Sequence, residues 1–140
     1  MKPRLLIIDD EKSICVSLSL ALSPSFDVTW VTDPDEGLEL LRSQGDFSLL
    51  ILDLVIGDRD GLEVLQAAKE VDSEIAVIVM TAYGSIRSSV KAMKAGAFTY
   101  LSKPLDIEEL MVYIGQALEF RSLNQRVSYL SDVLNTRDQY

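Results

Sequence analysis

The chain of 140 residues is long enough for one domain with a hydrophobic core and too short for two domains of ordinary size. Apolar residues make up 48% of the sequence, a proportion that argues against disorder. Thirteen basic and 22 acidic residues give a formal net charge of −9, which disfavours direct binding to nucleic acid because contacts with phosphate need lysine and arginine.

The sequence contains no histidine, and this excludes several kinds of chemistry on this chain. Catalysis by serine or cysteine with a histidine base, metal sites with histidine ligands, and phosphotransfer through histidine all require that residue. The single cysteine, Cys15, cannot form a disulfide within the chain and is typical of a reducing cytosol. No apolar run approaches the roughly 20 residues that cross a bilayer, and the first residues lack the apolar segment of a signal peptide. We therefore expect a cytoplasmic protein with no membrane segment.

Five segments of the chain have the pattern of β-strands. Residues 4–8 and 49–52 contain unbroken apolar runs, the first of them directly after Arg4, as expected for strands that are covered on both faces in the middle of a parallel sheet. Residues 26–32 alternate between apolar and polar side chains, which predicts an edge strand with one exposed face. Residues 75–80 form another buried strand, and residues 98–101 form the fifth.

A helical pattern follows each strand. Asp33 followed by Pro34 begins the second helix, and Gly45 ends it. Ser85 is the expected cap of the fourth helix, which Gly96 closes. The remaining helices are expected to follow Glu11, to begin at Gly61 and to begin at Asp106. Strand and helix thus alternate five times, which predicts an α/β fold with a doubly wound, five-stranded parallel sheet.

Four of the five strands end on polar side chains. In a parallel sheet these endings share one rim, although they are far apart in the sequence: Asp9 and Asp10, Asp53, Thr81, and Lys103. Three acids at one rim repel one another unless a cation joins them, and carboxylates with a backbone carbonyl suit Mg²⁺. Taken singly, each residue has an ordinary alternative, such as a helix-start acid, a turn former or a solvated lysine. As an ordered set on one rim they indicate a functional site.

With these residues in this order, the sequence resembles the receiver domain of two-component response regulators. The resemblance covers residues 4–119 and is carried by four motifs: Asp9-Asp10, Asp53, Thr81-Ala82 and Lys103-Pro104. It implies a flavodoxin-like fold with the strand order 2-1-3-4-5, and a receiver domain over residues 1–119.

The resemblance also implies a role for each acid. Asp53 would be the phosphoacceptor, acting as a covalent nucleophile, and would also be a metal ligand. Asp10 would bind Mg²⁺ directly, Asp9 would bind it mainly through water, and the backbone carbonyl of Val55 would be a further ligand. The attack of a carboxylate on a negatively charged phosphoryl group is limited by charge repulsion, which a metal ion and a lysine reduce.

Further roles fall on the ends of the fourth and fifth strands. The resemblance implies that Lys103 pairs with the phosphoryl oxygens and that the Thr81 hydroxyl forms a hydrogen bond to them. Tyr100 would be an aromatic switch whose ring rotates inward as Thr81 moves. The Lys103–Pro104 bond would be a cis peptide. These changes would alter the surface around the fourth helix, the fifth strand and the last helix.

Three residues near the site bear on the stiffness of the loop after Asp53 and on the rate of hydrolysis. Gly57 stands where the family usually has proline, which predicts a looser loop after Asp53. Val55 and Tyr83 would flank the path of an attacking water, and neither is a good water-orienting group. We therefore expect slow hydrolysis of the phosphoryl group. The chain would catalyse only its own phosphorylation and this slow hydrolysis, and would not be a turnover enzyme.

The final helix continues past the usual end of a receiver domain, so residues 120–140 are expected to form a helical linker. Five apolar residues in it alternate spacings of three and four, the pattern of a coiled-coil seam: Phe120, Leu123, Val127, Leu130 and Leu134. This pattern favours a homodimer. The alternative is a linker helix that packs on the neighbouring domain of its own chain.

Residues 81–85 and 90–97 resemble the receivers of sigma-54-dependent AAA+ transcription activators, the NtrC-like subfamily. In that subfamily such a helix leads to an ATPase domain and then to a DNA-binding domain. The resemblance therefore implies that these output domains belong to a longer regulator of which this chain is the amino-terminal part.

The leading functional hypothesis is a signalling domain that a sensor histidine kinase phosphorylates. One alternative is a Mg²⁺-dependent phosphatase of the haloacid-dehalogenase type, which also uses an aspartate nucleophile. That family needs the pattern Asp-x-Asp, and residues 9–11 and 53–55 both lack it. Another alternative is an interaction module that works without phosphorylation.

Overall fold

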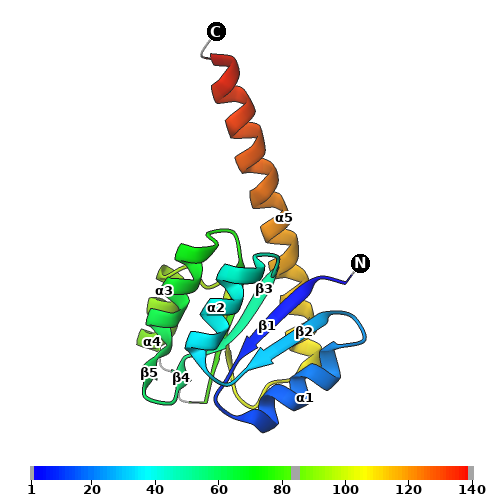
Figure 1. Ribbon diagram of the computed structural model, residues 1–140, viewed down its shortest axis with the longest axis vertical. Coiled ribbons are helices and arrows are strands. Elements are labelled where there is room, and N and C mark those ends of the chain that lie inside the picture. The colour runs from blue at the N-terminus through cyan, green and yellow to red at the C-terminus, as the bar shows by residue number, and fades with distance from the viewer. Residues whose placement is uncertain (1, 83–85, 139–140) are drawn as a thin grey trace.

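The computed structural model describes the backbone of residues 2–82 and 86–138, and the side chains of residues 2–82 and 87–126. Five strands pair in parallel in one sheet, in the order β2-β1-β3-β6-β7 (Figure 1). These are β1 (Arg4–Ile8), β2 (Asp27–Val31), β3 (Leu49–Asp53), β6 (Ala76–Thr81) and β7 (Thr99–Ser102). Counted along the chain, the sheet order is 2-1-3-4-5, so the predicted topology is confirmed.

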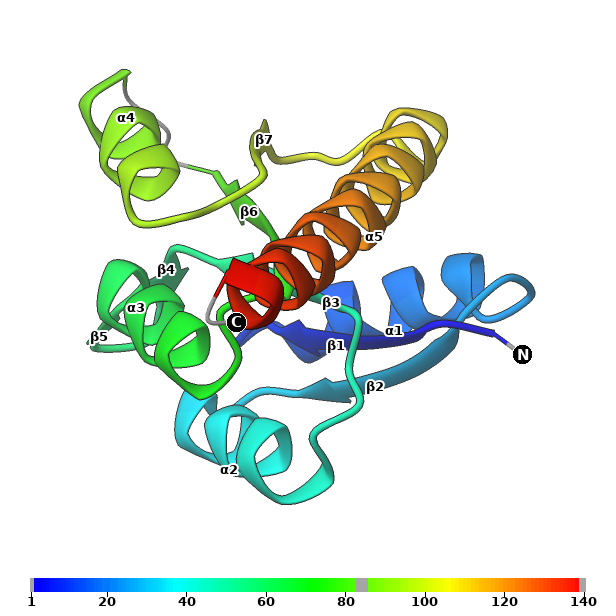
Figure 2. The same ribbon diagram turned by 90° about the horizontal axis from the view of Figure 1, so that it is seen from above.

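Helices cover both faces of the sheet, as a doubly wound fold requires (Figure 2). They are α1 (Lys12–Leu22), α2 (Pro34–Gln44), α3 (Gly61–Val71), α4 (Ile86–Lys94) and α5 (Ile107–Asp138). Helices α2, α3 and α4 contribute to one hydrophobic core, and α1 and α5 contribute to the other. The sheet separates the two cores, which explains why its central strands must be apolar on both sides.

The continuous apolar runs fill both cores at once. Along β3, Leu50 and Leu52 pack on the side of α2 and α3, whereas Leu49 and Ile51 pack on the side of α1 and α5. All four side chains are fully buried. Full burial of each such side chain stabilises the fold by about 1.5–3 kcal/mol. By contrast, β2 lies at the edge of the sheet, as predicted, but its burial does not alternate, because three consecutive residues are half-buried.

The helix ends follow the local signals in the sequence. The Asp33 carboxylate accepts a hydrogen bond from the backbone N–H of Asp35 at 3.1 Å, and Gly45 ends α2 with a left-handed φ of 66°. After α4, Gly96 has a φ of 106°, and the N–H of Ala97 donates to the carbonyl of Ala92 at 3.0 Å. The expected cap at Ser85 lies outside the described residues.

Two features extend the predicted fold. A short antiparallel hairpin, formed by β4 (Val55–Ile56) and β5 (Arg59–Asp60), follows Asp53 and was not predicted. Helix α5 is continuous to Asp138, and its carboxyl-terminal part extends away from the sheet and the other helices (Figure 1). Within the described part of the chain, no helix is both long and apolar enough to cross a membrane.

Candidate functional site

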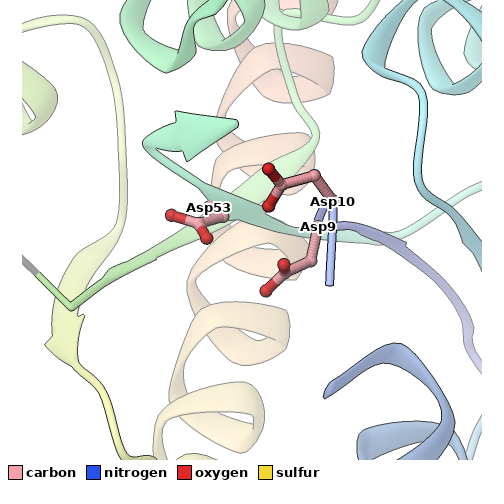
Figure 3. Close-up of side chains that lie close together, drawn as sticks. All are labelled: Asp9, Asp10 and Asp53. Atoms are coloured by element: carbon pink, nitrogen blue, oxygen red, sulfur yellow. The ribbon is translucent and has the colours of Figure 1, made fainter. Parts of the chain in front are cut away.

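The carboxyl ends of the central strands bring the predicted site residues together. Asp9 follows β1, Asp53 ends β3, Thr81 ends β6 and Lys103 follows β7. Figure 3 shows Asp9 and Asp53 close together with Asp10. One carboxylate oxygen from each of these three acids lies within 4.8 Å of the others. The predicted convergence of acids at one rim is therefore present in the structure.

Among the described residues, Lys103 brings positive charge to this rim. Its Nζ atom lies 2.7 Å from Oδ2 of Asp53 and 2.8 Å from Oδ2 of Asp9. Both acids are buried, with 0% of Asp9 and 3% of Asp53 exposed, and only 9% of the Lys103 side chain is exposed. Glu11 is a more distant partner at 3.8 Å and is largely exposed. One ammonium group therefore bridges two buried carboxylates, and the exposed Asp10 adds a further negative charge beside them.

Backbone N–H groups hold the other oxygens of the two buried acids. Oδ1 of Asp9 accepts from the N–H of Glu11 at 2.8 Å, and Oδ1 of Asp53 accepts from the N–H of Val55 at 2.9 Å. In each case the donor is two residues ahead, the pattern of an Asx turn, in which an aspartate side chain closes a turn after its own residue. Both carboxylates are therefore fixed from two sides, by a backbone donor and by Lys103.

Burial and hydrogen bonding act in opposite directions on the pKa values of Asp53 and Lys103. Desolvation raises the pKa of Asp53 above its usual value, although the hydrogen bonds from Lys103 and Val55 act in the opposite direction. Burial by itself would lower the pKa of Lys103, but hydrogen bonds to Asp53 and Asp9 outweigh it and the pKa is raised. The lysine thus stays protonated at neutral pH, while burial keeps the Asp53 carboxylate costly to ionise. A divalent cation beside Asp53 would relieve this cost.

The donor set fits a hard cation. Three carboxylates from Asp9, Asp10 and Asp53 supply only oxygen atoms, which are the ligands that Mg²⁺ prefers. Asp10 is exposed, so the cluster opens to solvent on its side. Oδ2 of Asp9 and Oδ2 of Asp53 also contact the Lys103 ammonium, so these two acids have a positive partner besides any bound cation.

The remaining predicted residues lie at the same rim or beside it. Thr81 is buried at the end of β6, and the Lys103–Pro104 peptide is cis, as predicted. Tyr100 is half-buried in β7 and packs against the core formed by α2, α3 and α4. Its hydroxyl oxygen is buried without a hydrogen-bond partner among the described residues. Tyr83, predicted to flank the site, lies outside them.

Cys15, on α1, contacts the backbone of the site at Asp9. Its thiol donates to the backbone carbonyl of Asp9 at 3.3 Å and is fully buried. Burial, followed by the charge of Asp9, raises the pKa of Cys15 to about 11. The thiol is therefore protonated at neutral pH and serves as an apolar packing group, as expected for a small residue on a helix.

One contact of the site was not predicted from the sequence, a hydrogen bond between Gly57 and Asp10. The backbone N–H of Gly57 donates to Oδ2 of Asp10 at 2.9 Å. Sequence patterns rarely reveal such donors, because every residue except proline carries an N–H. The only signal was the glycine in a position where the resemblance led us to expect proline.

Comparison with known proteins places this architecture in a family. Residues 5–115 match the response regulator receiver domain family. The chain belongs to this family, which confirms the predicted class of protein.

Particular relatives refine the assignment. The chain is 34% identical over 122 residues to the transcriptional regulatory protein ZraR of Klebsiella oxytoca, covering 86% of this chain and 27% of ZraR. It is 29% identical over 138 residues to the regulatory protein AtoC of Escherichia coli, covering 98% of this chain and 30% of AtoC. The chain thus spans less than a third of the length of these relatives. Both relatives are sigma-54-dependent, NtrC-like activators, and the predicted subfamily resemblance is confirmed.

Solved structures agree with this assignment. The beryllofluoride-activated receiver domain dimer of NtrC4 superposes with a TM-score of 0.79 at 33% identity, covering 84% of this chain and 98% of that one. A CheY-like receiver domain from Methanospirillum hungatei gives a TM-score of 0.84 at 28% identity, covering 89% and 99%. These similarities confirm the flavodoxin-like fold.

Proposed function

We propose that this receiver domain is a phosphorylation-controlled switch in which Asp53 accepts a phosphoryl group from a sensor histidine kinase. The observation that carries the proposal is the geometry around Asp53. Its carboxylate is buried, is held by the Val55 N–H at 2.9 Å and contacts the Lys103 ammonium at 2.7 Å, and it shares the rim with two further acids. This combination provides a fixed nucleophile, a positive group and a set of oxygen ligands in one place.

The transfer step follows from this arrangement. A carboxylate oxygen of Asp53 forms a bond to phosphorus while the P–N bond of the donor phosphohistidine breaks, and the electron pair of that bond leaves on the imidazole nitrogen. Lys103, already between Asp53 and Asp9, moves its hydrogen bonds to the new phosphoryl oxygens. The N–H of Val55 keeps the carboxylate plane fixed during attack. Hydrolysis of the product is expected to be slow, because Val55 offers no group that orients water.

We assign the metal site to the three acids. Asp10 and Asp53 would bind Mg²⁺ directly, Asp9 mainly through water, and the carbonyl of Val55 would complete the protein ligands. When bound, the ion would neutralise charge on the phosphoryl oxygens. The exposed position of Asp10 supports access from solvent, and the burial of Asp53 supports a need for added positive charge.

The response to phosphorylation would pass through Thr81 and Tyr100. The phosphoryl group adds negative charge and acceptor oxygens at the rim, and the Thr81 hydroxyl would form a hydrogen bond to one of them. Tyr100 would then rotate inward and change the surface formed by α4, β7 and α5. The Tyr100 hydroxyl is buried without a hydrogen-bond partner among the described residues, which costs about 1–3 kcal/mol, so the ring gains from any rotation that supplies a partner.

The output would involve dimerisation. Phe120 and Leu123 begin the predicted seam on α5 and are 53% and 50% exposed. The Phe120 ring also contacts Phe98 at a centroid distance of 5.6 Å, so the seam starts at the surface of the receiver itself. We infer a receiver over residues 1–119 and a helical linker over residues 120–140. In the full regulator the linker would lead to AAA+ and DNA-binding domains, and the protein would work in the cytoplasm.

A phosphatase of the haloacid-dehalogenase type is not favoured. The chain belongs to the receiver family, and neither rim segment carries the Asp-x-Asp pattern. Turnover separates a phosphatase from a phosphoacceptor domain, because a phosphatase would hydrolyse an unrelated phosphate ester many times.

Phosphorylation can be tested with acetyl phosphate as the donor. We expect one phosphoryl group per chain in the presence of Mg²⁺, no uptake with EDTA, and a label that persists well beyond seconds. Asp53→Asn should abolish uptake because it removes the nucleophile. Asp58→Asn, which changes an exposed acid in the hairpin, is the matched control and should label normally. Labelling of Asp53→Asn at the wild-type rate would contradict the proposal. Intact-mass spectrometry gives the readout.

Dimerisation can be tested by light scattering with beryllofluoride and Mg²⁺, which mimic the phosphorylated state. We expect the activated wild type to become dimeric. Leu123→Asp should remain monomeric because it places a charge in the seam, whereas Leu20→Asp, at an exposed apolar residue of α1, should dimerise normally. An activated wild type that stays monomeric would favour the alternative, a linker helix that packs within its own chain.

A further inference from the structure

Gly57 connects the unpredicted hairpin to the acid cluster. It lies between β4 and β5, with a φ of 56°, a left-handed conformation that glycine adopts without strain. From this position its backbone N–H donates to Oδ2 of Asp10 at 2.9 Å. A residue of the hairpin therefore contacts the one acid of the cluster that is exposed to solvent.

Proline could not make this contact. Its nitrogen carries no hydrogen, and its ring restricts φ to about −65°, far from the angle observed at Gly57. A proline here would restrict the loop through its ring and would supply no donor. In this chain the same position supplies a hydrogen-bond donor instead.

The hairpin is anchored at several points. The N–H of Val55 donates to Asp53, and the N–H of Gly61 donates to the carbonyl of Leu54 at 3.0 Å. On β5, the Arg59 guanidinium contacts the Asp35 carboxylate of α2 at 2.7 Å. One short segment thus donates to two of the three acids, to Asp53 near its start and to Asp10 at its turn.

We propose that the backbone N–H of Gly57 is a positioning group that orients the Asp10 carboxylate for binding a divalent cation. The inference rests on the proposed metal site. Asp10 is exposed, so water already solvates its charge, and removal of the N–H changes its electrostatics little. What the hydrogen bond supplies is a fixed side-chain rotamer before the cation arrives. Its loss should therefore weaken cation binding.

The variant Gly57→Pro removes the donor. We expect its Mg²⁺ dissociation constant, measured by isothermal titration calorimetry, to rise about 3- to 10-fold, the factor for immobilising one side chain on binding. Gly57→Asn keeps the N–H and tolerates a positive φ, so it should bind Mg²⁺ within about twofold of wild type. Equal affinities in the proline and asparagine variants would overturn the proposal.

Amide hydrogen exchange separates positioning from general loop damage. With Gly57 retained, Asp10→Ala should accelerate exchange of the Gly57 amide about tenfold or more relative to the wild type, as expected for loss of a hydrogen bond to a charged acceptor. Asp10→Asn, which retains an acceptor oxygen, should preserve most of the protection. In Gly57→Pro, the Val55 amide should remain protected, which shows that the start of the hairpin is intact. A Gly57 amide that is indifferent to Asp10→Ala would refute the inference.

These results are distinguishable from failure of the proposed function. If the wild type binds no Mg²⁺ and takes up no phosphoryl group, the metal site itself is wrong. If the wild type does both and the proline variant matches it, the metal site stands and only the role of Gly57 falls.

Discussion

Lys103→Met is expected to destabilise the protein by about 3 kcal/mol in solution without Mg²⁺, because it leaves two buried carboxylates without their shared cation. The lysine contacts Asp9 and Asp53 at 2.8 and 2.7 Å, and all three side chains are largely shielded from solvent. Urea denaturation in EDTA measures the change in the free energy of unfolding. Lys94→Met, at an exposed lysine of α4, is the matched control and should change stability by less than about 0.5 kcal/mol.

A second substitution tests the cause of this loss. Adding Asp53→Asn to Lys103→Met removes one of the two unpaired charges, so the double variant should be more stable than Lys103→Met alone. Mg²⁺ should also restore part of the stability of Lys103→Met, because the cation takes over some of the neutralisation. If Lys103→Met is as stable as wild type in EDTA, the two carboxylates are not held by this lysine.

The same variant should respond to pH in a defined direction. The pKa of Asp53 is raised in the folded state, so the native protein binds more protons than the unfolded chain just above the ordinary aspartate range. The stability contributed by this proton uptake is present at low pH and is lost as the pH rises through the raised pKa. Without Lys103 the pKa rises further, and the stability deficit of Lys103→Met should therefore be larger at pH 8 than at pH 5.

Gly61→Ala is the other substitution with a large expected effect. A Cβ atom at this position would lie 2.4 Å from both the Cα and the carbonyl oxygen of Leu54, so the added atom meets backbone that cannot simply rotate away. We expect a loss of about 3 kcal/mol, at the upper end of the usual range for overpacking. Because Leu54 directly follows Asp53, the shift should also slow phosphorylation with acetyl phosphate.

Gly115→Ala provides the matched comparison for Gly61→Ala. It lies within α5, and a Cβ there meets nothing within 4 Å, so the substitution should stabilise the protein by about 0.5–1 kcal/mol through helix propensity. Urea denaturation of both variants tests the difference. A Gly61→Ala protein as stable as wild type would mean that the start of α3 does not pack against Leu54 as described.

The fold could be predicted because strands that are buried on both faces must be apolar at every position. Leu50 and Leu52 face one core, and Leu49 and Ile51 face the other, so the central strand is necessarily an unbroken apolar run. The order of motifs along the chain then predicted which residues share the rim. That inference needed only the rule that parallel strands end at the same edge.

The hairpin and its donors could not be predicted in the same way. Val55 and Gly57 contribute through backbone N–H groups, which carry no residue-specific signature. The sequence predicted a looser loop at Gly57 and gave no indication that its N–H donates to Asp10 from a positive φ. For Val127, Leu130 and Leu134 of the seam, the structure describes the helix but not the side chains, and the coiled coil stays a prediction.

Locating the phosphoryl group tests directly whether Asp53 is the phosphoacceptor. After incubation with acetyl phosphate and Mg²⁺, reduction with borohydride converts an aspartyl phosphate to homoserine, and peptide mass spectrometry identifies the residue. We expect a single conversion at Asp53, with Asp9 and Asp10 unchanged. Conversion at either of these acids instead, or none at Asp53 in a protein that has taken up phosphate, would contradict this expectation.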